Sequence, residues 1–303
     1  MKKIIVFHEI YNLKTFKKTI LHIKKNNKFV SLKEFLSSSD DNLCHVTFDD
    51  AHFTFIEAFK FLKEEQIPTT LFLSINKIKN NNNFWFQDLE QINNQLRNNF
   101  DKEFINYFKI KYNHNKFTYF DVIKNLNIDK IDDFIKKIKF KYSIKISYVN
   151  IPLDIMEKLI NEALLDFGAH TINHPILANE NLDKATHEIK ESIDELENFL
   201  QRKTNTFAYP NGIKNLDFSE REKDILKKNN IEYAFTMKLA PYSKEKVDQY
   251  EIPRVSFGGN FLKNYFINKN PSFYETISNI NIPYLREPEN YRRFQLKKFL
   301  INK

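Results

Sequence analysis

Two adjacent aspartates, Asp49 and Asp50, follow directly after an apolar, β-branched run in the stretch CHVTFDDAH. Adjacent carboxylates repel each other, and the end of a buried strand is a costly place to desolvate them. The two other Asp-Asp pairs of the chain follow a serine run or lie in a lysine-rich helical segment, where water can solvate them. Asp49 and Asp50 could therefore do chemistry, although a helix that begins at Asp50 as its cap would also explain the pair.

Two histidines four residues apart, His170 and His174, stand in the stretch DFGAHTINHP. One helical turn would bring their imidazoles to the same side, which is the geometry of two ligands on one metal ion. Together with Asp50 they would form a set of two histidines and one carboxylate that leaves positions open for water and substrate. These three residues are the candidate metal ligands.

The elements that must carry these residues alternate along the chain, a pattern typical of a parallel α/β protein. Short apolar runs predict strands at residues 4–8, 44–48, 69–74, 165–170, 206–209, 233–237 and 252–257. Amphipathic stretches predict helices at residues 13–25, about 54–66, and 182–200. All three candidate ligands fall at the C-terminal ends of predicted strands, where barrel enzymes assemble their sites.

A polar, lysine-rich helical segment interrupts this alternation at residues 76–150. We expect a single domain spanning residues 1–303, with this segment as a helical insertion over the face that carries the site. Trp85, the only tryptophan, is flanked by Phe84 and Phe86. It would either anchor the insertion to the barrel or offer a platform on which a sugar ring stacks.

The composition excludes several classes of function. The chain has 303 residues, 42% of them hydrophobic, so it can bury a sizeable core. Its net charge of +8 comes from scattered lysines that do not alternate with stacking aromatics, so we expect no nucleic-acid partner. A single cysteine, Cys44, excludes an intramolecular disulfide and a cysteine-based zinc site. Because no signal-peptide core or transmembrane window is present, we expect a cytoplasmic chain.

Three stretches in order, VTFDDAH, GAHTINHP and FAYPNG, resemble the motifs of the polysaccharide deacetylases, the NodB-homology enzymes of carbohydrate esterase family 4. The resemblance runs over about residues 4–257 and leaves the insertion uncovered. It implies an α/β fold, a distorted (β/α)7 TIM-like barrel, and hydrolysis of an N-acetyl amide on an amino sugar. It also implies that Asp49 is the catalytic base and that the metal is bound by Asp50, His170 and His174.

The resemblance gives the two adjacent acids different tasks. A divalent ion, Zn²⁺ in the first place and Co²⁺ or Ni²⁺ as alternatives, would lower the pKa of a water molecule, and Asp49 would take its proton. The ion would also keep Asp50 ionised. One feature of this motif departs from the family pattern, since Ala51 stands where a glycine usually follows the two aspartates. The tight turn there must form without that glycine.

The residue that orients the base also departs from the usual pattern. The third motif lacks the arginine with which it commonly opens. A branch of the family that has the FAYP form and acts on exopolysaccharide amino sugars carries an arginine in a late strand instead, and Arg254 in EIPRVSF has the matching place. A surface salt bridge is the alternative explanation for Arg254.

Family members often end with a Leu-x-His motif whose histidine is the general acid, and this late motif is absent, because the last histidine of the chain is His187. The leaving amine would then be protonated by His8 at the end of the first strand, by His52, or by water. Tyr209 in the third motif would lie where a backbone N–H helps to hold the oxyanion, or it would pack in the core.

The leading hypothesis is a metal-dependent hydrolase that removes an N-acetyl group from an amino sugar. Its substrate would be a surface-glycan precursor, lipid-linked or nucleotide-linked, or a polysaccharide. The alternative is a non-catalytic glycan-binding or scaffold protein on a degenerate deacetylase fold, which the missing histidine motif favours. The basic tail at residues 288–303 could contact an anionic membrane face, or it would close the fold as a helix with solvated lysines.

Overall fold

Seven parallel strands form one curled sheet in the order β7-β6-β5-β4-β3-β1-β8. The computed structural model describes residues 1–109, 117–243, 245–271 and 289–301. The short β2 pairs with the start of β3, outside this order. The strands are β1 (Lys3–Phe7), β2 (Lys28–Phe29), β3 (Leu43–Asp49), β4 (Thr69–Leu73), β5 (Leu165–Ala169), β6 (Thr206–Ala208), β7 (Tyr233–Phe235) and β8 (Val255–Ser256). Strands β1, β3 and β4 are buried along their whole length, as parallel strands covered on both faces require.

The chain over residues 249–257 bridges the two edges of this sheet. Its first half bonds to β7, where the Ile252 N–H donates to the Ala234 carbonyl at 2.9 Å. Its second half pairs with β1, and the Phe257 N–H donates to the Val6 carbonyl at 3.2 Å. The sheet therefore curls into the distorted seven-stranded barrel that the sequence predicts, and this prediction is confirmed.

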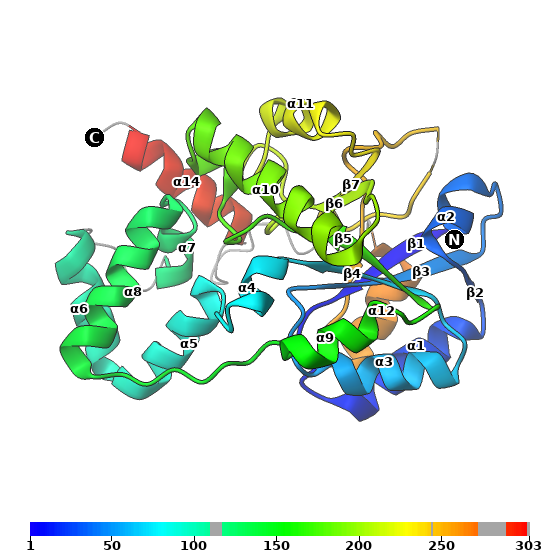
Figure 1. The fold of residues 1–303 in the computed structure, drawn as a ribbon, viewed down its shortest axis with the longest axis horizontal. Coiled ribbons are helices and arrows are strands. Elements are labelled where there is room, and N and C mark those ends of the chain that lie inside the picture. The colour runs from blue at the N-terminus through cyan, green and yellow to red at the C-terminus, as the bar shows by residue number, and fades with distance from the viewer. Residues whose placement is uncertain (110–116, 244, 272–288, 302–303) are drawn as a thin grey trace.

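Helices pack around the barrel, as Figure 1 shows. They are α1 (Leu13–Lys24), α2 (Leu32–Ser37), α3 (Phe55–Glu64), α10 (Leu182–Leu200), α11 (Glu220–Lys228) and α12 (Phe261–Lys269). Helix α10 begins at Asn181, whose side chain accepts the N–H of Lys184 and so caps the helix. The predicted apolar face is buried against the main core at Ala185, Ile189, Ile193 and Leu196, which fixes how α10 lies on the barrel, while Leu182 at its start is exposed.

Between β4 and β5 the described residues form helices and no strand. These are α4 (Ile75–Lys79), α5 (Trp85–Leu96), α6 (Asn98–Phe108), α7 (Tyr119–Ile123), α8 (Ile128–Tyr142) and α9 (Leu153–Leu159). Helices α5 to α8 enclose a second apolar cluster, to which Leu296 of α14 (Glu289–Ile301) also contributes. Figure 1 shows these helices at the left of the view, beside α14. The boundaries of the expected insertion, 76–150, stay a prediction.

Helix α14 contains most of the basic tail, while residues 288 and 302–303 lie outside the described residues. Both oxygens of the buried Asp121 on α7 accept hydrogen bonds from Arg292, at 2.8 and 2.9 Å. Arg293 forms a second buried ion pair, with Asp217. These two arginines therefore hold α14 against the protein, so a membrane contact would have to rest on other residues of the tail. Across the described ranges, no helix is long and apolar enough to cross a membrane.

Candidate active site

The candidate residues gather at one edge of the barrel because parallel strands bring their C-terminal ends together. His8 directly follows β1, Asp49 is the last residue of β3, and Asp50 comes next. His170 directly follows β5, and Arg254 lies just before β8, in the segment that bridges the sheet. The residues that share this edge are thus far apart in the sequence.

Asp50, His170 and His174 form a buried group whose possible ligand atoms lie within 4.8 Å of one another. The Asp50 Oδ1 atom lies 3.5 Å from the Nε2 atoms of both histidines. This distance is longer than a normal hydrogen bond to nitrogen. The structure therefore brings together the ligand set that the sequence predicts, with its ligand atoms turned toward one point.

The hydrogen bonds around this group show that it fits a cation. The Nδ1 of His170 lies 2.7 Å from the Ala208 carbonyl, so Nδ1 donates and, in the neutral imidazole that a metal ion would bind, Nε2 keeps a lone pair on the side of Asp50. Burial lowers the pKa of His174 to about 3, so this imidazole is neutral and also offers a lone pair. The buried Asp50 Oδ1 has no hydrogen-bond partner within the described part of the chain. Two imidazole nitrogens and a carboxylate are a donor set that suits Zn²⁺.

Two of the three candidate ligands, Asp50 and His174, and two of their neighbours have left-handed backbone conformations. Asp50 has a φ of 70°, Ala51 of 54°, Thr171 of 61° and His174 of 58°. Residues other than glycine adopt this region at a cost of roughly 1–2 kcal/mol, and such strain gathers at functional sites. Ala51 thus forms the turn for which glycine would be the usual residue, and the fold tolerates the strain.

Glu188 on α10 holds the loop between the two histidines. Its buried carboxylate accepts the N–H groups of Ile172 at 3.0 Å and Asn173 at 2.8 Å, and the Asn173 side-chain amide at 2.8 Å. The Thr171 hydroxyl accepts the N–H of His174 at 3.0 Å. We did not predict a role for Glu188 from the sequence; the available signal was an acid on the apolar face of a helix.

Asp49 and Arg254 form a bidentate ion pair in the interior, with both N–O distances at 2.7 Å. The Arg254 Nε atom also donates to the Thr236 carbonyl at 3.1 Å. Burial has the largest single effect and would raise the pKa of Asp49, but the Arg254 guanidinium together with His170 and His8 holds this pKa below its ordinary value. Arg254 has 0% of its side chain exposed, which does not fit the alternative of a surface salt bridge.

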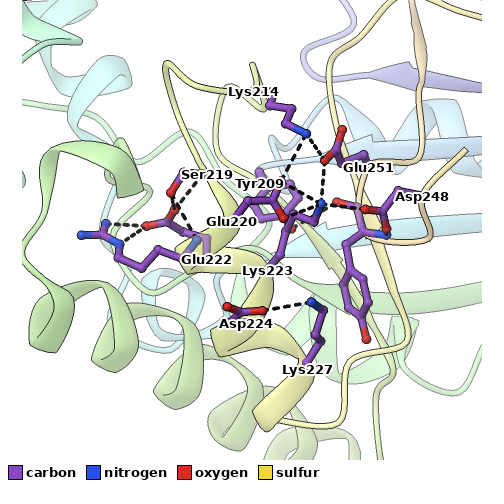
Figure 2. Close-up of polar contacts among 12 residues, drawn as sticks. Tyr209, Lys214, Ser219, Glu220, Glu222, Lys223, Asp224, Lys227, Asp248 and Glu251 are labelled. Atoms are coloured by element: carbon purple, nitrogen blue, oxygen red, sulfur yellow. Dashed lines mark hydrogen bonds and ion pairs between the residues drawn. The ribbon is translucent and has the colours of Figure 1, made fainter.

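An ion-pair network fastens the segment that leads to Arg254, as Figure 2 shows. Lys223 on α11 is buried and contacts Asp248 at 2.6 Å and Glu251 at 2.7 Å. Lys214 contacts the same oxygen of Glu251 at 2.6 Å. Because Glu251 precedes Arg254 by three residues, this network ties α11 to the segment that carries the guanidinium.

Two aromatic candidates serve packing. Trp85 is 3% exposed and its Nε1 donates to the His174 carbonyl at 2.9 Å, so it links α5 to the ligand loop, which favours the anchor over the sugar platform. The Tyr209 N–H donates to the Phe235 carbonyl at 3.1 Å, and its ring stacks on Phe218 with centroids 3.8 Å apart. Because this N–H is already bonded, the contacts favour the alternative of a core residue, and an oxyanion contact from this motif stays a prediction.

A pocket of about 470 Å³ opens beside Asp50, and His8, His52 and Phe86 are among the residues that line it. The His8 Nε2 lies 3.6 Å from Asp49 Oδ2, and its side chain is 41% exposed. It can therefore reach both the carboxylate and a ligand in the pocket.

His52 presents a fixed tautomer to this pocket. The Thr54 N–H donates to the His52 Nδ1 at 3.4 Å, so this nitrogen is an acceptor, and the Thr54 hydroxyl 2.8 Å away donates to it as well. The Nε2 of His52 then carries the ring proton, 4.0 Å from Glu9 Oε1. Burial lowers the pKa of His52, so a neutral imidazole donates into the pocket.

The chain is similar to known proteins both in sequence and in fold. A family model described as polysaccharide deacetylase matches residues 37–234. The deacetylase PplD of Streptococcus pyogenes in complex with acetate is similar in structure, with 17% sequence identity, a TM-score of 0.59, and coverage of 89% of this chain and 98% of that chain. No curated protein matches.

Two further solved structures have the same fold. IcaB from Ammonifex degensii is 14% identical, with a TM-score of 0.56 and coverage of 87% of this chain and 94% of that chain. A de-N-acetylase from Aggregatibacter actinomycetemcomitans is 13% identical, with a TM-score of 0.53 and coverage of 87% and 99%. At these identities, the likeness shows a shared fold.

Proposed function

The chain belongs to the polysaccharide deacetylase family and is a hydrolase of the N-acetyl amide of a glycan, and on that premise we propose that its activity depends on a divalent metal ion. One observation carries the proposal. The buried group of Asp50, His170 and His174 lies at the same barrel edge as Asp49, the neighbouring acid that pairs with Arg254 instead of joining the group.

We expect Asp50, His170 and His174 to hold the ion, with Zn²⁺ in the first place and Co²⁺ or Ni²⁺ as alternatives. When bound there, the ion would supply Lewis-acid chemistry, which polarises the acetyl carbonyl and makes a water molecule more acidic. Glu188 would keep the two histidines in place through the loop that it holds.

Asp49 is the proposed general base. It lies beside Asp50 in the sequence, and Arg254 keeps its carboxylate ionised and fixed in direction. An ionised carboxylate can accept the proton that the attacking water loses when its oxygen bonds to the acetyl carbon. The bidentate contact leaves the lone pairs on the outer side of the carboxylate for that proton.

His8 is the proposed proton donor for the leaving amine, and it takes the place of the missing Leu-x-His histidine. Its Nε2 lies 3.6 Å from Asp49 Oδ2, and its exposed part lines the pocket. When the C–N bond breaks, the nitrogen needs one proton, and a protonated His8 can give it. His52, whose Nε2–H faces the pocket, would donate a hydrogen bond to the substrate.

Acetate release tests the proposal. Purified protein would be incubated with N-acetylglucosamine oligomers as isolated, after chelation, and after addition of Zn²⁺, Co²⁺ or Ni²⁺. We expect release that stops with the chelator and returns with a metal ion. A protein that binds no metal and releases no acetate under any of these conditions would support the alternative, a glycan-binding protein on a degenerate fold.

A further inference from the structure

The pocket beside Asp50 is acidic, although the protein is basic. The chain carries 47 lysines and arginines against 39 aspartates and glutamates. Among the described residues, those that line the pocket include Glu9, Asp50 and Glu90 but no lysine or arginine. Asp50 belongs to the proposed metal ligands, so Glu9 and Glu90 are the two carboxylates of the pocket that the proposed reaction does not use.

Tyr11 lies with the two glutamates at the mouth of this pocket. All three residues line the same pocket, and burial together with the charges of Glu9 and Glu90 raises the pKa of Tyr11. The Tyr11 side chain is nevertheless 73% exposed, so most of its ring is open to a ligand. Glu9 and Tyr11 follow β1, while Glu90 comes from α5.

We infer that Tyr11, Glu9 and Glu90 form a subsite for a glucosaminium unit, a sugar that has already lost its acetyl group. This inference rests on the proposed function and adds its substrate class. The apolar face of the sugar would lie on the Tyr11 ring, and its ammonium group would pair with the carboxylates. The sugar that is to be deacetylated would lie next to it, toward Asp50.

The same charges disfavour a phosphate group at this place. A sugar carried on a nucleotide or on a lipid diphosphate would bring negative charges next to Glu9 and Glu90, and like charges in contact cost free energy. Within the part of the pocket that the structure describes, no lysine or arginine would offset them. The subsite should therefore bind a partly deacetylated glycan chain in preference to a diphosphate-linked precursor.

Binding to an inactive protein tests the subsite without any need for turnover. The Asp49→Asn variant would be titrated by calorimetry with glucosamine oligomers and with N-acetylglucosamine oligomers of the same length and linkage. We expect the cationic oligomer to bind about tenfold more tightly at low salt, and this preference to shrink at high salt, because salt screens exposed charges. Equal affinities, or a preference for the acetylated oligomer, would overturn the inference.

Substitutions in the same background identify the residues responsible. Glu9→Gln and Glu90→Gln should each reduce the preference about threefold, the size expected of a partly exposed ion pair. Tyr11→Ala should weaken binding of both oligomers, while Tyr11→Phe should not, since the ring remains. Glu157→Gln on α9, which removes the same charge far along the chain on an exposed side chain, should leave the preference unchanged.

Turnover separates failure of the subsite from failure of the proposed function. If Glu9→Gln lowered kcat equally on acetylated and partly deacetylated oligomers while the binding preference stayed intact, Glu9 would be a proton donor and not part of the subsite. If no oligomer released acetate but the binding preference was present and sensitive to Glu9 and Glu90, the subsite would stand and the proposed activity would fail.

Discussion

Arg254 holds both oxygens of Asp49 at 2.7 Å, although the two residues belong to segments separated in the sheet by β1. The guanidinium enters from the segment that bridges β7 and β1, so the pair can form only when the barrel has closed. Both side chains are buried, so salt screens their interaction little. The guanidinium that helps to keep Asp49 ionised therefore comes from the segment just before β8, the last strand of the sheet along the chain.

Replacing Arg254 should change the pH dependence of the rate. Arg254→Met should keep its metal and move the acidic limb of kcat/KM to higher pH, because loss of the guanidinium raises the pKa of Asp49. Arg254→Lys should restore only part of the original profile, because lysine supplies charge without the planar fork. The measurement is kcat/KM against pH for metal-loaded protein, with metal content as the control. An unmoved limb would make Arg254 a structural ion pair only.

Trp85→Phe should weaken the ligand loop and leave sugar binding unchanged. The variant keeps a ring at this position but removes the N–H that donates to the His174 carbonyl. We expect the free energy of unfolding to fall by about 1 kcal/mol, the net value of a buried hydrogen bond. Urea unfolding measures this. Unchanged stability together with a higher KM for the oligomer would instead favour the sugar platform that the sequence left open.

The main features of the fold and of the ligand set could be predicted because they depend on local patterns. Apolar runs between amphipathic helices predict the strands, and residue type and spacing single out Asp50, His170 and His174. Other features depend on contacts between distant segments. The Tyr209 N–H is bonded to the Phe235 carbonyl of β7, a contact that depends on strand pairing. The acidic pocket forms because α5 brings Glu90 to the pocket that the residues after β1 also line.

The role of Glu188 also depends on contacts between distant segments and could not be predicted from the sequence. A substitution of Glu188 tests whether it holds the loop between the two histidines. Glu188→Gln keeps the shape of the side chain but removes its charge, and with its one oxygen on the Ile172 and Asn173 N–H groups its NH₂ group faces the Asn173 side-chain amide. We expect a loss of about 1.5–3 kcal/mol in the free energy of unfolding and roughly tenfold weaker Zn²⁺ binding. A zinc-chelator competition measures the affinity.

The matched control for this prediction is Glu191→Gln, which removes one exposed charge from the same helix. This variant should leave both the stability and the Zn²⁺ affinity near those of the parent. Equal Zn²⁺ affinity in the Glu188 and Glu191 variants would show that the loop does not need the carboxylate.

His45 should make the stability of the protein depend on pH. Its ring lies 2.8 Å from the Val30 carbonyl and 2.9 Å from the Thr70 hydroxyl, and burial lowers its pKa from 6.5 to about 4. The unfolded chain then takes up a proton below pH 6.5 that the folded chain refuses until about pH 4. Stability from this group is therefore complete above pH 6.5 and is lost as the pH falls to about 4, by about 3 kcal/mol in total.

Urea unfolding of the wild type and of His45→Asn at several pH values in this window tests the assignment. Asparagine does not titrate, so the variant should show a flatter dependence of the free energy of unfolding on pH, whatever its absolute stability. Parallel curves for the two proteins would assign the pH dependence to other groups.

The most direct test of the proposed site compares two isosteric substitutions at neighbouring positions, Asp49→Asn and Asp50→Asn. Metal content and acetate release would be measured on both purified variants. The division of tasks predicts that Asp49→Asn keeps about one metal ion per chain and releases almost no acetate, because an amide cannot accept the proton. Asp50→Asn should lose the ion, because the charged ligand is gone. Near-normal turnover in Asp49→Asn, or a full metal content in Asp50→Asn, would contradict this account.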